Sequence, residues 1–177
     1  PIYLDHNATT PLLSEVADAM RACWAEPVLN PSSQHTFGRR ARHILEDSRD
    51  RIAQLLGAST AGPSPDRVVF TSGGTEANNL AIRSFVPRDL RVDAIRGVPV
   101  PQPHVIISAI EHHSIATLAD HLTQTGNAID RIAVDQNGVV TLIDLARLIK
   151  TETRVVATLL AHNETGVIQP VAEFAAL

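Results

Sequence analysis

Two adjacent glycines, Gly73 and Gly74, mark the segment of this sequence that is best suited to bind a ligand. Residues 68–70 are apolar, as in a strand buried within a parallel sheet, and Gly73 and Gly74 follow shortly after. Thr75 is a good N-cap for a helix, and glycine lets a ligand approach the main chain. Free N–H groups at such a helix start bind anions, most often phosphate. Because neither G-x-G-x-x-G nor a P-loop lysine is present, an ordinary strand-to-helix turn stays open beside the phosphate site.

Polar side chains also follow two later apolar runs. Glu111 and His112 come after residues 105–108, and Asn163 comes after residues 155–161. The carboxyl ends of parallel strands gather ligands at one edge of a sheet. A phosphate turn, a flat ring and a carboxamide at that edge would suit a flat phosphorylated cofactor. Taken singly, His112 and Asn163 fit plain turn residues equally well.

The elements that must position these groups alternate between strands and helices. Strands are expected at 68–70, 105–108, 129–134 and 155–161, and helices at 11–26, 35 or 36–56, 75–86, 114–125, 141–150 and from about 170. Ser114 and Thr141 are the expected caps of the fourth and fifth helices. This alternation predicts an α/β fold with a mainly parallel sheet and helices on both faces. Residues 87–103 contain four prolines and predict a surface loop.

Composition excludes several classes of function. The net charge of −4 is scattered, so no nucleic-acid surface is expected. No apolar run approaches 18 residues and we expect no signal peptide, so we expect a soluble cytoplasmic protein without membrane contact. The single cysteine, Cys23, excludes an internal disulfide and a cysteine-based zinc site, and we predict no metal. Cys23 falls on the apolar face of the first helix and is expected to be buried.

Five motifs in order make the chain resemble a known family. They are YLDHNATT at 3–10, NPSSQHTFG at 30–38, FTSGGTEANN at 70–79, EH at 111–112 and HNETG at 162–166. With them the chain resembles the class V, fold-type I pyridoxal-phosphate enzymes, and among these the cysteine desulfurases. The resemblance implies the large domain of the aspartate-aminotransferase-like fold, truncated, with residues 11–177 as its N-terminal part and 1–10 as an arm near the active site.

The resemblance also implies roles for individual residues. Gly74 and Thr75 would hold the phosphate of pyridoxal 5'-phosphate, and His112 would stack on its ring as a catalytic residue. Asn163 would contact the cofactor's phenolic oxygen and the substrate carboxylate. The lysine that binds the cofactor, the aspartate at its pyridine nitrogen and the sulfur-accepting cysteine would all lie C-terminal to residue 177. Lys150, the sole lysine, is expected at an exposed helix end and cannot replace the missing one.

The implied reaction removes sulfur from L-cysteine, giving L-alanine and an enzyme persulfide for iron–sulfur cluster assembly or other sulfur-transfer pathways. The implied partners are a second copy in a homodimer and a sulfur-acceptor or scaffold protein. We expect the 177-residue chain alone to be inactive. Three alternatives stay open: a selenocysteine lyase, a cysteine sulfinate desulfinase, and a non-catalytic binding or assembly module that keeps the fold.

Overall fold

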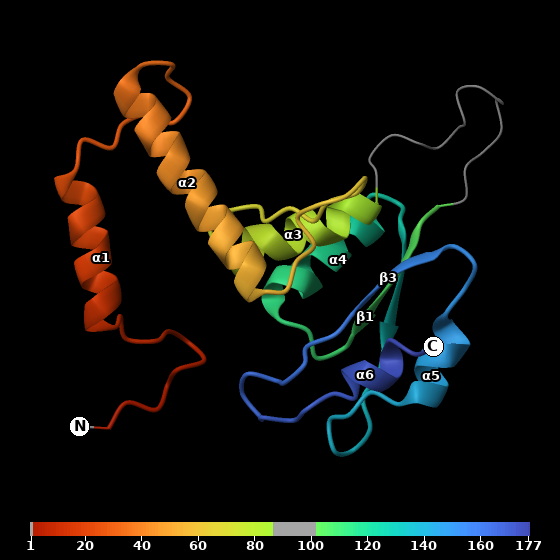
Figure 1. Ribbon diagram of the computed structural model, residues 1–177. Helices are drawn as coiled ribbons and strands as arrows, with labels where there is room; N and C mark the ends of the chain where they lie inside the picture. The colour runs from red at the N-terminus through yellow and green to blue at the C-terminus, as the bar shows by residue number, and fades with distance from the viewer. Residues whose placement is uncertain (1, 87–101) are drawn as a thin grey trace, which may run out of the picture. The chain divides into compact units, whose positions relative to one another are not determined.

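Figure 1 shows the computed structural model, which describes residues 2–86 and 102–177. The chain forms two compact units, Pro1–Phe70 and Thr71–Leu177. Most of the loop predicted over 87–103 lies outside the described residues.

The first unit holds an N-terminal arm with a turn at residues 6–8, followed by two helices, α1 (Ser14–Ala25) and α2 (Thr36–Leu55). Both helices were predicted, and their ends differ from the prediction by a few residues. The imidazole of His35 caps α2 by accepting the Gly38 N–H at 3.3 Å. A side-chain carbon on Gly38 would collide with the Ser33 carbonyl, so this helix needs a glycine there. Cys23 on α1 is half-buried, less than the sequence predicted.

The predicted strand at 68–70 is wrong. Val69 is 61% exposed and Phe70 is 45% exposed, and no strand of the described chain pairs with this segment. The segment contacts α2 instead, because Arg49 donates to the Val68 carbonyl and its guanidinium lies 4.9 Å from the centre of the Phe70 ring. An apolar run becomes a strand only where another strand satisfies its main chain.

The second unit is built on a three-stranded parallel sheet in the order β2-β1-β3. The strands are β1 (His104–Ser108), β2 (Ala128–Ile132) and β3 (Thr153–Ala157). Central β1 is buried along its whole length and pairs Val105 with Ile129 and Val155. Because β1 is apolar on both faces, it requires cover on both sides, as predicted.

Helices supply that cover from both sides (Figure 1). On one face, α3 (Gly74–Phe85) and α4 (His113–Gln124) pack against Val105 and Ile107 through a cluster that includes Leu118. On the other face, Ile106 packs with Leu145 of α5 (Leu142–Leu148), and α6 (Val171–Phe174) adds Phe174. Thr141 caps α5 as predicted, by accepting the Asp144 N–H at 3.2 Å.

A polar network lies near the amino ends of the strands. Buried His104 places Nδ1 2.8 Å from the Thr153 hydroxyl and Nε2 3.0 Å from the Asp130 carboxylate. Lys150 Nζ donates to the same carboxylate at 2.8 Å, and this hydrogen bond is the main cause of a lowered pKa for Asp130. The network occupies the end of the sheet opposite to His112, which follows the carboxyl end of β1.

Candidate functional site

The glycine pair opens α3 without special backbone angles. Gly73 precedes the helix at φ 165° and ψ 178°, an extended conformation that any residue adopts. The sequence predicted Thr75 as the N-cap of this helix, but Gly73 holds that position. A side-chain carbon on Gly73 or Gly74 would meet no atom within 4 Å apart from those of its chain neighbours and the adjoining helix backbone. The first N–H groups of a helix have no intrahelical acceptor and carry its positive end. The two glycines therefore leave these donors accessible to an anion.

A carboxylate fixes the turn that leads into α3. Glu76 accepts hydrogen bonds from the main-chain N–H and the hydroxyl of Ser72, both at 2.7 Å. These bonds lower the pKa of Glu76, with the hydroxyl as the larger cause. Ser72 was expected at the end of a strand; instead it is held by the helix that follows it.

His112 caps α4, a role predicted for Ser114. Its Nδ1 accepts the Ser114 N–H at 3.1 Å, while the residue as a whole is exposed. An imidazole nitrogen with a free lone pair does the work that a serine hydroxyl usually does at this position. His112 therefore lies in the turn between β1 and α4. Its predicted stacking on a cofactor ring stays a prediction.

A side-chain bond joins the glycine-turn helix to the His112 helix. Asn78 of α3 donates its Nδ2 to the Ser114 hydroxyl at 2.8 Å, across 36 residues of sequence. In the same helix, Asn79 donates to the Thr75 carbonyl at 2.9 Å. The two helix starts that carry Thr75 and His112 are thus bonded to each other.

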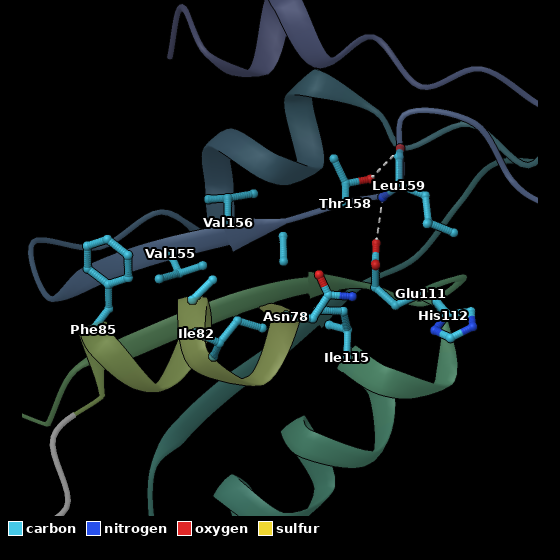
Figure 2. A pocket seen from close by; sticks show the side chains of 12 residues that line it. Asn78, Ile82, Phe85, Glu111, His112, Ile115, Val155, Val156, Thr158 and Leu159 are labelled. Carbon is cyan, nitrogen blue, oxygen red and sulfur yellow. Dashed lines mark hydrogen bonds between the residues drawn. The ribbon is translucent and has the colours of Figure 1, made fainter. Parts of the chain in front are cut away.

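Glu111 joins the segments that follow β1 and β3. One carboxylate oxygen accepts the buried Ser108 hydroxyl at 2.6 Å and the Leu159 N–H at 2.8 Å. Figure 2 shows the carboxylate directed at Leu159, with His112 beside it on the same turn. Glu111 therefore fixes the turn on which His112 lies.

A pocket of 320 Å³ opens between α3, the β1 turn and β3. In Figure 2, Phe85 and His112 mark opposite ends of its lining. Its polar lining comes from Asn78, Glu111, His112 and Thr158. Of the four predicted site residues, His112 lines the pocket, and Gly74, Thr75 and Asn163 are not among its lining residues.

Asn163 lies in a tight turn after β3. The turn is closed by an antiparallel bridge between Ala161 and Ile168, and Gly166 takes φ 73° within it. His162, left without a functional role in the sequence analysis, accepts the N–H groups of Glu164 and Thr165, both at 3.2 Å. The structure thus gives His162 a structural role and places Asn163 in an exposed turn, without bringing it into the pocket.

Sequence reasoning gave Asn78 and Glu111 no role and gave Ser114 only the role of a helix cap. Asn78 lies three residues after Thr75, the spacing at which helical side chains share a face, but this spacing does not show that Asn78 reaches Ser114 on another helix. The bond from Glu111 to Leu159 joins strands that are neighbours only in the sheet, and no local pattern reports it.

Within residues 2–86 and 102–177, no helix is long and apolar enough to cross a bilayer. In the same part of the chain, no three His, Cys, Asp or Glu side chains gather in a group that could hold a metal ion.

Comparisons with known proteins agree with this architecture. The family described as aminotransferase class-V matches residues 2–177. A cysteine desulfurase IscS from Dictyoglomus turgidum is 37% identical over 172 residues, which are 97% of this chain and 40% of that protein. A selenocysteine lyase from Bos taurus is 39% identical over 182 residues, again 97% of this chain and 40% of that protein.

A solved structure described as a NifS-like protein superposes with a TM-score of 0.82 at 30% identity, covering 99% of this chain and 44% of that one. The chain thus spans about 40% of the length of the curated relatives it matches. Its parallel sheet covered by helices is the N-terminal part of the fold found in those pyridoxal-phosphate proteins, truncated relative to them. The chain belongs to the aminotransferase class-V family.

Proposed function

We propose that this chain is the N-terminal part of a pyridoxal-phosphate-dependent cysteine desulfurase. The observation that carries the proposal is the open start of α3, bonded through Asn78 and Ser114 to the helix that His112 caps. The similarity to a cysteine desulfurase over 97% of the chain supports the same reaction class.

The residues present fit the cofactor. A phosphate dianion is favoured at the amino end of a helix, where N–H groups and the dipole both attract it. Open space over Gly73 and Gly74 admits the phosphate, and Thr75 adds a hydroxyl. His112 offers an exposed flat ring for stacking.

When bound, the cofactor supplies an electron sink for bond changes at the substrate's Cα and Cβ. The residues of this chain bind and orient: Gly74 and Thr75 hold the phosphate, His112 covers the ring, and Asn163 holds the phenolic oxygen and the substrate carboxylate. We place the cofactor-binding lysine and the sulfur-accepting cysteine in the rest of the protein. That thiol, as thiolate, would take the sulfur and leave L-alanine.

The same proposal covers organisation and partners. We propose that residues 1–10 form an arm near the active site and that 11–177 belong to the large domain. The parent protein is proposed to be a cytoplasmic homodimer. Its sulfur would pass to an acceptor or scaffold protein in iron–sulfur cluster assembly. Apolar side chains on α1 are open to a second copy, with Met20 39% and Trp24 72% exposed. Light scattering should give the parent twice its subunit mass, and a clean monomer would contradict this.

The phosphate contact has a sharp test at Gly74. Gly74 is the first residue of α3, a position where proline is favoured and costs the helix nothing. Gly74→Pro therefore removes one N–H donor and little else, whereas Gly74→Ala keeps the donor. Titrated with pyridoxal phosphate and followed by ³¹P NMR, Gly74→Pro should bind about fivefold to tenfold more weakly than Gly74→Ala. Equal affinity of the two variants for pyridoxal phosphate would contradict the proposal that this turn binds the phosphate.

A selenocysteine lyase is the second candidate, because a protein of that name is 39% identical to this chain. The parent protein should be given L-cysteine, L-selenocysteine and L-cysteine sulfinate in parallel, with alanine release as the readout. Fastest turnover of L-cysteine is expected. Release from selenocysteine alone would favour the second candidate, and release from none of the three would favour a non-catalytic module.

A further inference from the structure

Two hydrogen bonds from Ser114 reach one nitrogen of His112, and a third reaches the hydroxyl of that serine. The Ser114 main-chain N–H lies 3.1 Å from Nδ1, and the Ser114 hydroxyl lies 2.9 Å from the same atom. Asn78 Nδ2 lies 2.8 Å from that hydroxyl. Ser114 is 7% exposed, so water does not readily replace these partners.

The chemistry of the donors decides where the hydrogen of the ring lies. A main-chain N–H can only donate, so Nδ1 must present its lone pair. An amide Nδ2 can also only donate, so the Ser114 oxygen accepts from Asn78 and directs its own hydrogen at Nδ1. The hydrogen of the neutral imidazole is therefore on Nε2.

We propose that Asn78 and Ser114 are positioning residues that hold His112 in the Nε2–H form. This rests on the proposed function, in which the ring of His112 lies against the cofactor. In this form the neutral ring presents a hydrogen-bond donor at Nε2, and its basic lone pair is occupied by the cap of α4. His112 can accept a proton only at Nδ1, and a hydrogen there would face the Ser114 N–H and break the cap.

Asn78 and Ser114 act through the direction of their hydrogen bonds, and variants that change this direction but keep the shape separate this role from a purely structural one. Asn78→Asp keeps the shape of the side chain but replaces the amide donor by an acceptor. The Ser114 hydroxyl would then donate to the new carboxylate and could accept from Nδ1–H. Ser114→Ala removes the hydroxyl and leaves the main-chain N–H. Thr117→Ala, an exposed change on the same helix, is the matched control.

The test is a long-range ¹H–¹⁵N correlation spectrum of the imidazoles in the full chain at pH 8, without cofactor. The signals of His112 are assigned by their loss in His112→Gln. Wild-type and Thr117→Ala should show the Nε2–H form. Asn78→Asp and Ser114→Ala should raise the fraction of the Nδ1–H form about fivefold, the effect of one hydrogen bond.

A wild-type His112 in the Nδ1–H form, or a tautomer ratio unchanged in both variants, would overturn the proposal. If Ser114→Ala does not fold, Asn78→Asp decides alone, with its main-chain spectrum as the check on folding. The measurement needs no cofactor, so it can fail while the Gly74 titration succeeds, and the reverse. The two failures are therefore distinguishable.

Discussion

At the scale of single residues, Glu111 bonds two segments of the second unit to each other. Its carboxylate satisfies the Ser108 hydroxyl, which is fully buried, and the Leu159 N–H beyond β3. Hydrogen bonds to a charged group stabilise more than neutral ones, and a buried donor without a partner is costly. Glu111→Ala should therefore lower the free energy of unfolding by about 2–3 kcal/mol in urea titrations.

The matched control for Glu111→Ala is Glu111→Gln, which keeps an oxygen able to accept both bonds. It should cost about 1 kcal/mol or less, the difference between a charged and a neutral acceptor. Equal losses in the two variants would show that the packing of the side chain matters and that its hydrogen bonds do not.

The types and order of the residues in the sequence were enough to predict the position of one candidate site residue, His112. A histidine after a buried strand was placed correctly, since apolar runs mark strands and the polar residue after them marks the strand end. The cap was assigned to Ser114 because serine is the commoner cap, whereas the His112 ring holds that place. The convergence of Asn78 on Ser114 depends on how two helices pack, and sequence spacing within one helix does not report it.

At the scale of elements, β1 was predictable because its apolar residues face cores on both sides. The run at 68–70 carries the same residue types, yet it is exposed and bonded to Arg49. The difference lies in pairing: β1 has β2 and β3 beside it, and residues 68–70 have no strand beside them in the described chain. Composition identifies a segment that could be a strand, and a partner strand decides whether it is one.

The network at the amino ends of the strands makes a pH-dependent prediction. The Lys150 ammonium lowers the pKa of Asp130, so the carboxylate stabilises the fold above its unfolded-state value of ~3.9. That contribution is lost as the pH falls through the lower, folded-state pKa. Asp130→Asn should therefore cost about 1 kcal/mol at pH 6, a modest value because the side chain is 35% exposed. The cost should shrink steadily in urea titrations below about pH 4.

Asp120→Asn is the matched control for this pH dependence. Asp120 pairs with Arg131 at 2.6 Å but is 66% exposed, so its loss should cost less than about 0.5 kcal/mol at pH 6. A cost for Asp130→Asn that stays constant down to pH 3 would show that its effect does not come from the charge.

At the scale of the whole molecule, the sole lysine of the sequence lies apart from the candidate site. The sequence predicted Lys150 at an exposed helix end. The structure places it just after α5, where its ammonium is half-exposed and pairs with Asp130 at 2.8 Å. This pairing and its distance along the sheet from His112 both separate Lys150 from the candidate site.

Lys150 should therefore not capture pyridoxal phosphate covalently. Attack on the cofactor aldehyde needs an uncharged amine, and enzymes obtain one by burying a lysine or placing it beside another cation. Lys150 has the opposite surroundings, a carboxylate and solvent. After the chain is mixed with pyridoxal phosphate and reduced with borohydride, mass spectrometry should find no stoichiometric adduct. Lys150→Arg, which removes the sole lysine, gives the background from the terminal amine. An adduct of one cofactor per chain that disappears in Lys150→Arg would show that this lysine reaches the cofactor.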